Sequence, residues 1–220
     1  MKKIYLLLFA LVAMTSLASA QGLDKGWWGI RGGVNFSNLS SADYSTDYYT
    51  GYTVGATYSL PISKSIPIYI ESGLYFQHRG ARDKGFLTDA GEDSTLKMYE
   101  FEVPLQLGFA APISGKWSIH PFVGLYYSVA VNGKFEIGDD EFDPYKDELL
   151  QTLRDVEPVE QQLLHRSDFG LRMGVSVLYN RYLLGFAYDA GLTNLYSKDL
   201  RDQGYEAQAG SFTLQVGYNF

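Results

Sequence analysis

The chain has three histidines and no cysteine, so nucleophilic or proton-transfer chemistry would have to be built around His78, His120 or His165. The best combination is His78 with Asp83 and Ser94. All three fall near one polar loop, and a hydrolytic site needs a nucleophile or an activated water beside a histidine and an acid. Loops are naturally rich in serine and aspartate, so coincidence explains this combination well. Phosphate-binding glycine loops and His-x-x-His metal spacings do not occur. We therefore predict no enzyme activity and no cofactor.

Ten acidic residues lie between Glu136 and Glu160. A Ca²⁺ site would use such oxygens, but the spacing is not that of an EF-hand, so the sequence favours a solvated acidic loop and leaves cation binding at residues 136–160 open. Within this loop, Asp143 and Pro144 can begin a short helix as N-cap and first helical residue. The helix would carry an apolar stripe able to cap the structure or to receive a partner. The stripe consists of Tyr145, Leu149, Leu150, Leu153 and Val156.

Residues 1–20 have the layout of a cleavable signal peptide. Lys2 and Lys3 precede an apolar run, which is followed by the small residues Ala18, Ser19 and Ala20. The run is shorter than the ~20 residues that a membrane-spanning helix needs. Without the two lysines, 16 basic residues face 25 acidic ones. This balance speaks against a nucleic-acid partner. We predict that residues 21–220 form one exported domain.

Side chains alternate between apolar and polar along eight segments, the pattern of strands with two unlike faces. The segments are residues 27–38, 51–60, 66–79, 96–110, 116–131, 167–179, 182–193 and 209–220. Long polar connections alternate with short turns, which is typical of an up-and-down barrel. The segments meet or exceed the ~9–11 residues that cross a bilayer as a tilted strand. Pro104 and Pro121 fall inside two segments, and we expect β-bulges there.

The glycines indicate which face of the strands lies inside. Eight of them share the polar face, and small residues are needed where side chains converge in a narrow barrel. They are Gly33, Gly55, Gly73, Gly108, Gly124, Gly174, Gly185 and Gly217. Charged side chains on that face must be paired, since they are removed from water. We predict a network across the lumen formed by Arg31, Glu71, Glu102, Arg172 and Asp189. It would act as a structural plug or, less favoured, as a selectivity filter along a narrow water path.

The last residues, 209–220, alternate strictly and end on Phe220, with Tyr218 two residues earlier. This ending resembles the C-terminal signal of bacterial outer-membrane proteins. Further matching stretches are Gly29–Leu39, Glu100–Phe109, Ser167–Val177 and Gly191–Leu195. With them, the chain resembles the porin-family outer-membrane barrel domain common in Bacteroidetes-type bacteria, an OmpA/OmpX-like eight-stranded barrel. The resemblance implies an outer-membrane location and recognition of the last strand by the barrel assembly machinery. It carries over no catalytic residue.

The sequence thus predicts an all-β, eight-stranded antiparallel up-and-down transmembrane β-barrel with a polar interior and an apolar, lipid-facing exterior. The expected role is a non-enzymatic, porin-like one, either as a scaffold that makes surface contacts through its long loops or as a narrow passage for small solutes. Two alternatives stay open. One is a soluble lipocalin-like barrel around a lipophilic ligand, and the other is an outer-membrane enzyme acting on lipid or peptide.

Overall fold

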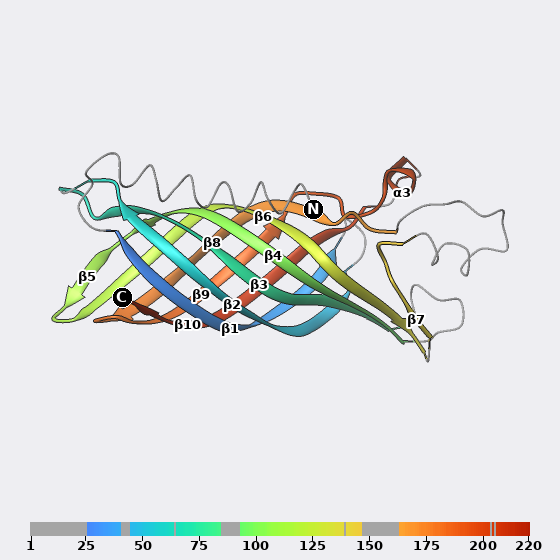
Figure 1. Ribbon diagram of the computed structural model, residues 1–220, viewed down its shortest axis with the longest axis horizontal. Coiled ribbons are helices and arrows are strands. Elements are labelled where there is room, and N and C mark those ends of the chain that lie inside the picture. Colours follow the sequence, from blue (N-terminus) through green and yellow to red (C-terminus); the bar gives the residue numbers. More distant parts are fainter. Residues whose placement is uncertain are drawn as a thin grey trace.

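The computed structural model describes residues 26–40, 45–63, 65–84, 93–138, 140–146, 163–202, 204 and 206–220. The predicted signal peptide and most of the segment after Asp143 lie outside these ranges. Within them the chain forms ten strands and one short helix (Figure 1). These are β1 (Trp27–Ser40), β2 (Asp47–Pro61), β3 (Ile68–Lys84), β4 (Asp93–Phe109), β5 (Ala111–Ser114), β6 (Trp117–Ile137), β7 (Asp140–Phe142), β8 (Ser167–Tyr179), β9 (Tyr182–Gly191), α3 (Lys198–Asp202) and β10 (Gln208–Asn219).

The strands close into an antiparallel barrel. Its wall runs β1-β2-β3-β4-β6-β8-β9-β10, and β10 pairs with β1 to complete the circle. The short strand β5 prolongs β4 along β6, and β7 pairs with the far end of β6. The predicted eight-stranded up-and-down barrel is therefore confirmed, with two additional short strands. No helix in the described part of the chain is both long and apolar enough to cross a membrane.

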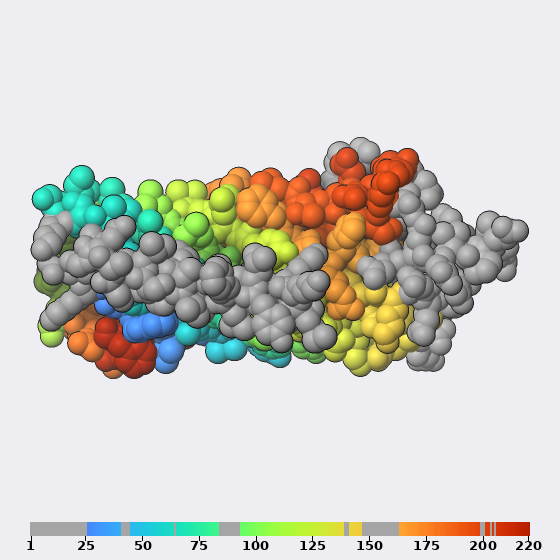
Figure 2. All heavy atoms as spheres, turned by 45° about the horizontal axis from the view of Figure 1, so that its top comes forward, coloured from blue at the N-terminus to red at the C-terminus, as the bar shows by residue number. Residues whose placement is uncertain are grey.

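The two ends of the barrel differ. The connections β2–β3, β5–β6 and β8–β9 are short and lie at one end with the C-terminus, which we call the short-turn end. The connections at the opposite, long-loop end are longer, and β3, β4, β6 and β7 reach farthest in that direction (Figure 1). Figure 2 shows the yellow residues that follow β6 and the orange-red segment around α3 gathered at this same end.

The polar face lies inside and the apolar face outside, as predicted. Polar side chains such as Asn35, Thr57 and Ser211 are fully buried in the lumen, whereas Ile30, Val216 and other large apolar side chains of the opposite face are exposed. A soluble barrel built around an apolar ligand would show the reverse, so the fold does not support that alternative. Aromatic side chains gather on the exterior at the short-turn end, where Trp117 packs on Tyr179 at 4.8 Å between ring centroids. Such aromatic girdles are typical of barrels that cross a bilayer.

The predicted bulges at the two prolines are wrong. Pro104 lies opposite Tyr126 and Pro121 opposite Val175, and the register of β6 with β4 and with β8 is unbroken at both positions. A proline removes only its own N–H from the ladder, and here the Ser72 hydroxyl donates to the Pro104 carbonyl oxygen at 2.7 Å. The register shifts lie elsewhere, between Tyr48 and Tyr52 on β2, between Tyr99 and Glu100 on β4, and between Pro112 and Ser114 on β5.

The inward glycines have no room for a side chain. A Cβ atom placed on any of the eight predicted inner glycines would come within 3.0 Å of another atom. Two neighbours on β1 show the contrast most clearly. A Cβ on Gly33 would meet the Leu214 carbonyl oxygen and lie 2.9 Å from the Gln215 Cα, whereas a Cβ on Gly32 would point outward with its nearest neighbour at 3.9 Å.

We therefore expect Gly33→Ala to lower the free energy of unfolding by about 1–3 kcal/mol, because the added methyl group pushes β1 away from the β10 backbone. Gly32→Ala is the matched control and should change it by less than about 0.5 kcal/mol. Both variants restrict the unfolded chain equally. Urea unfolding in phospholipid vesicles, followed by tryptophan fluorescence, measures the difference. Equal stability of the two variants would show that Gly33 does not face a packed lumen.

Candidate functional site

The lumen contains charged side chains from five strands. Arg31 comes from β1, Glu71 from β3, Glu102 from β4, Arg172 from β8 and Asp189 from β9, and all five are buried. These are the five residues that the sequence singled out. The structure divides them between two groups at different heights in the barrel.

The first group is centred on Arg172. Its Nη1 donates to Glu102 Oε1 at 2.6 Å and to both carboxylate oxygens of Asp189 at 3.1 Å. Arg172 and Asp189 lie directly opposite each other on β8 and β9, while Glu102 reaches from the other side of β6. The guanidinium carbon of Arg172 also lies 5.5 Å from the centre of the buried Tyr75 ring. One arginine therefore links β4, β8 and β9 across the lumen.

A second arginine extends this group toward the long-loop end. Arg79 Nη1 lies 3.4 Å from Glu100 Oε2 and 3.9 Å from Glu102 Oε2. The Tyr126 ring lies 5.9 Å from the Arg79 guanidinium carbon, and the Tyr126 hydroxyl donates to Asp168 Oδ2 at 2.7 Å. The central group thus contains two arginines and four carboxylates.

The other group lies nearer the short-turn end around Glu71. Its carboxylate accepts from the Ser59 hydroxyl at 2.5 Å and from Gln106 Nε2 at 2.8 Å, and it lies 3.5 Å from Arg31 Nη2. Below it, the imidazole of His120 has the Tyr69 hydroxyl at 3.1 Å and the Ser118 hydroxyl at 2.9 Å. Arg31 and Glu71 therefore form a pair with no direct ion pair to Arg172.

The sequence prediction left out Arg79, Glu100 and Asp168. The signal for them was present, because each has the same parity along its strand as a residue that was included. Arg79 follows Glu71 on β3 by eight positions, Glu100 precedes Glu102 by two, and Asp168 precedes Arg172 by four. Arg79 was missed because the third strand was expected to end there, whereas β3 continues to Lys84.

An apolar layer fills the lumen above the charged groups, at the long-loop end. It consists of buried side chains from several strands and from the segments that cover the mouth. They are Ala81, Leu96, Met98, Ala130, Phe135, Tyr145, Leu164, Leu195 and Ala209. On β4 the boundary between the apolar layer and the charged lumen is abrupt, because the inward residues Leu96 and Met98 are followed directly by Glu100 and Glu102. The predicted polar interior therefore holds for the middle and the short-turn end, and it is wrong for the mouth.

At the same level, the outer face of β4 changes from polar to apolar side chains, while its inner face changes from apolar to charged ones. Thr95 and Lys97 precede Tyr99, and the positions beyond it are apolar as far as Phe109. Where the exterior meets water instead of lipid, the strands must bury their apolar side chains inside, as a soluble protein does. The register shift between Tyr99 and Glu100 lies at this level.

Segments from two long connections close the mouth. Leu164 N–H donates to the Pro144 carbonyl oxygen at 3.2 Å, and His165 N–H donates to the Leu195 carbonyl oxygen at 2.7 Å. Tyr145 packs into the apolar layer with the Arg166 guanidinium carbon 4.5 Å from its ring centre. Burial, with a smaller contribution from Glu100, raises the pKa of the Tyr145 phenol well above its ordinary value, so the hydroxyl stays neutral.

The three residues of the candidate hydrolytic site are not brought together. Asp83 and Ser94 lie opposite each other on β3 and β4 and both are buried in the mouth. His78 has the opposite parity on β3 and belongs to the exterior, where its ring stacks on Tyr99 at 4.4 Å between centroids. A histidine on the outer face cannot act as a base for a serine on the inner face.

The acidic loop is described only in part, since residue 139 and residues 147–162 lie outside the described ranges. The carboxylates of Glu136, Glu141 and Asp143 each have a lysine partner. Glu136 lies 2.5 Å from Lys97 Nζ, and Glu141 lies 2.7 Å from Lys134 Nζ. At the predicted helix start, Asp143 Oδ1 accepts from the Tyr145 N–H at 3.0 Å within a turn. The described residues contain no group of three side chains arranged to bind a metal.

Comparison with known proteins identifies the architecture. A family model described as outer membrane protein beta-barrel domain matches residues 19–197. No curated protein sequence matches the chain.

Solved structures match over most of the chain at low sequence identity. A major outer membrane protein of Thermus thermophilus is 12% identical, covers 89% of this chain and 100% of its own, and has a TM-score of 0.54. Neisserial surface protein A is 11% identical, covers 90% and 100%, and has a TM-score of 0.47. Ail, the attachment invasion locus protein of Yersinia pestis, is 15% identical, covers 89% and 99%, and has a TM-score of 0.45. These similarities concern the fold, which by itself does not give the function.

The geometry of the central group predicts a large loss of stability when Arg172 is replaced. Arg172→Leu should lower the free energy of unfolding by about 3–5 kcal/mol, because Glu102 and Asp189 keep their burial and lose their shared cation. Adding Glu102→Gln and Asp189→Asn removes the uncompensated charge and should restore at least half of the loss. Met173→Leu, on the lipid side of the next position, is the control and should cost less than about 1.5 kcal/mol. Urea midpoints measured in vesicles provide the comparison. A triple variant no more stable than Arg172→Leu alone would show that charge compensation is not what Arg172 supplies.

Proposed function

Since the chain belongs to the outer membrane protein β-barrel family, we propose that it is a closed, non-enzymatic barrel that serves as a scaffold and makes contacts at the cell surface. The long-loop end then faces the outside of the cell, as is typical of outer-membrane barrels. The proposal includes export by the signal peptide predicted at residues 1–20.

The observation that carries this proposal is the complete burial of the charged side chains at mid-height. Glu102 and Asp189 each have 0% of their surface exposed, and Arg79 and Arg172 are almost as inaccessible. A side chain that lines a water-filled pore borders water and is accessible to a water-sized probe. No water-sized space therefore lies beside these carboxylates, and the ion pairs link the inner faces of β3, β4, β8 and β9. The apolar layer above them adds a second closure, since a charged solute would have to leave water to cross it.

The outer end supports a role in surface contact. β3 and β4 each have 17 residues and β6 has 21, whereas ~9–11 residues suffice to cross a bilayer. These three strands and β7 therefore continue beyond the membrane as a pleated surface (Figure 1). Their exterior there is polar, with the ion pairs Lys97–Glu136 and Lys134–Glu141. A rigid, hydrated sheet held away from the lipid is suited to contact a partner outside the cell.

One observation favours the alternative of a narrow passage. Several buried polar atoms of the lumen have no hydrogen-bond partner among the described residues, including Arg79 Nε and Nη2, Glu102 Oε2 and Gln106 Oε1. Buried polar atoms are normally satisfied, and ordered water is the usual partner when protein groups are absent. The closed lumen has no water-sized space beside Glu102, so such waters could enter only if the ion-paired side chains moved apart. A chain of them would then be the first element of a path for small solutes.

The last strand supports a further part of the proposal, which is assembly through its C-terminal residue. β10 closes the barrel, and the Phe220 N–H donates to the Trp28 carbonyl oxygen at 2.8 Å. The Phe220 side chain is nevertheless exposed on the exterior, beside the Tyr218 ring at 5.2 Å. An exposed terminal aromatic ring on the closing strand is available to the barrel assembly machinery before the barrel is complete.

Planar-bilayer recording of the refolded chain tests the closed barrel. We expect no discrete conductance steps, although an unboiled gel shows the compact, heat-modifiable band of a folded barrel. A general porin added to the same bilayer is the control for insertion. Discrete steps whose ion selectivity changes in Glu102→Ala would contradict the proposal and make the lumen a pathway.

A further inference from the structure

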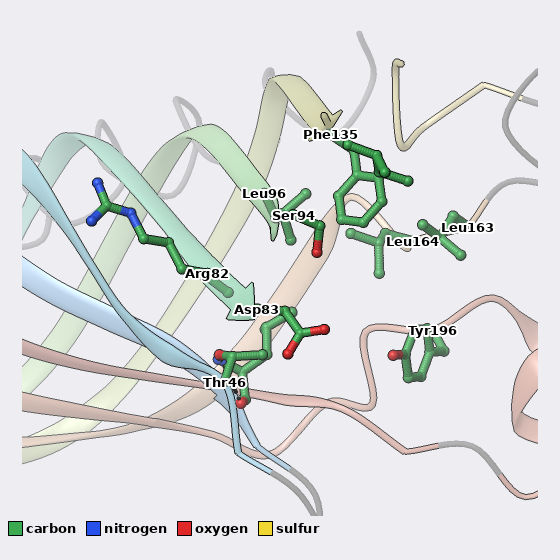
Figure 3. Close-up of a pocket in the computed structure, with 12 residues that line it drawn as sticks. Thr46, Arg82, Asp83, Ser94, Leu96, Phe135, Leu163, Leu164 and Tyr196 are labelled. Carbon is green, nitrogen blue, oxygen red and sulfur yellow. Dashed lines mark hydrogen bonds between the residues drawn. The ribbon is translucent and has the colours of Figure 1, made fainter. Parts of the chain in front are cut away.

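A small cavity lies at the long-loop mouth, within the apolar layer. Its volume is about 110 Å³. Leu96, Phe135 and Leu164 belong to its apolar wall, and the polar side chains of Asp83 and Ser94 also border it (Figure 3). It thus combines apolar walls with the Asp83 carboxylate, the hydroxyls of Thr46, Ser94 and Tyr196, and the Arg82 side chain.

The walls of the cavity are held by paired strands. Asp83 and Ser94 are direct partners in the β3–β4 ladder, and Leu96 is the next inward residue on β4 and faces Phe135 in the β4–β6 ladder. Leu164 is fixed by its backbone bond to Pro144. These side chains cannot simply collapse together, because their backbones are in register with their neighbours.

The size and lining of the chamber select an apolar occupant. A cavity of about 150 Å³ lined by leucine, isoleucine and phenylalanine stays dry and binds a molecule as small as benzene. The present chamber is of similar size and is mostly apolar. A single aromatic ring or a short branched alkyl group fits this description, whereas a full lipid acyl chain does not.

The polar end selects the head group of the occupant. An ionised carboxylate can only accept hydrogen bonds, and it has more acceptor sites than one partner uses. Figure 3 shows the Asp83 carboxylate directed toward the space that Ser94, Leu164 and Tyr196 surround. The same view shows the Arg82 guanidinium directed away from it, and its central carbon lies 5.4 Å from the Tyr49 ring centre. The chain also carries a net charge of −7, which concentrates cations near its surface.

We propose that the outer mouth binds small apolar amines, with the ammonium group donating to Asp83 and the Ser94 hydroxyl, and the ring or alkyl group packed against Leu96, Phe135 and Leu164. The site has no exit toward the periplasm, because Met98 and the Arg79–Glu100 pair lie beneath it on the inner face. It is therefore a place of capture at the cell surface and does not require that the lumen conducts. This inference goes beyond the closed-barrel function and can fail independently of it.

Titration calorimetry with benzylamine tests the site, using the full barrel in lipid nanodiscs without detergent. Empty nanodiscs give the background of partition into lipid. We expect saturable binding of one benzylamine per barrel and at least tenfold weaker binding of toluene, which keeps the ring and lacks the ammonium group. Asp83→Asn should weaken benzylamine binding at least tenfold and change toluene binding by less than threefold.

Two variants that fill the chamber test its location. Leu96→Phe and Ala81→Val should each abolish binding of both compounds, and the heat-modifiable band shows whether each variant is folded. Leu107→Phe adds the same ring on the lipid-facing side of β4 and should leave binding unchanged. The proposal is overturned if neither compound binds saturably or if folded filling variants bind as well as the parent. It is also overturned if toluene binds as tightly as benzylamine and Asp83→Asn binds benzylamine as tightly as the parent.

Discussion

The structure depends on the closure of the β-sheet between its first and last long strands. β1 and β10 pair without interruption from Gly29 opposite Asn219 to Ser40 opposite Gln208. In a hydrocarbon environment an unpaired strand edge leaves backbone groups without hydrogen bonds, at a cost of several kcal/mol each. The barrel is therefore stable in a membrane only if β1 and β10 pair. Closing only eight strands leaves a lumen just wide enough for side chains. The inner glycines, the buried Tyr75 and Tyr126 and the paired charges all follow from the narrow lumen.

Most of the fold could be predicted from the sequence, because side chains that alternate between apolar and polar indicate lipid on one face of each strand and a packed lumen on the other. The ends of the strands could not be predicted as well, and the reason is physical. Outside the bilayer both the exterior and the interior change their preference, so β3 and β6 continue beyond the point where the apolar pattern of the membrane segment ends. The positions of the bulges were not predicted either. A proline in a ladder proved compatible with continuous register, and the shift on β4 lies where the surroundings of the strand change from lipid to water.

The composition of the charged lumen could be predicted and its connectivity could not. Parity along each strand places Arg31, Glu71 and Arg172 inside, but which carboxylate meets which arginine depends on the stagger between strands. Arg172 meets Asp189 because the β8–β9 register sets them opposite each other, and Arg31 meets Glu71 from two strands away across β2. The apolar mouth depends in addition on Tyr145 and Leu164, which follow no strand pattern. Contacts of this kind arise from tertiary packing and leave little trace in local sequence.

The change of faces on β4 also fixes the thickness of membrane that this barrel matches. The outward apolar run extends from Tyr99 to Phe109, ten residue steps along one strand. At about 3.4 Å per step and a tilt of about 40°, the run spans roughly 26 Å along the membrane normal. A hydrocarbon layer of about 30 Å would cover the polar positions around Lys97, at a cost of fractions of a kcal/mol for each ångström of mismatch. The barrel therefore matches a thin bilayer. Lipids with longer chains would change the tilt of the barrel and lower the height of its mouth above the membrane.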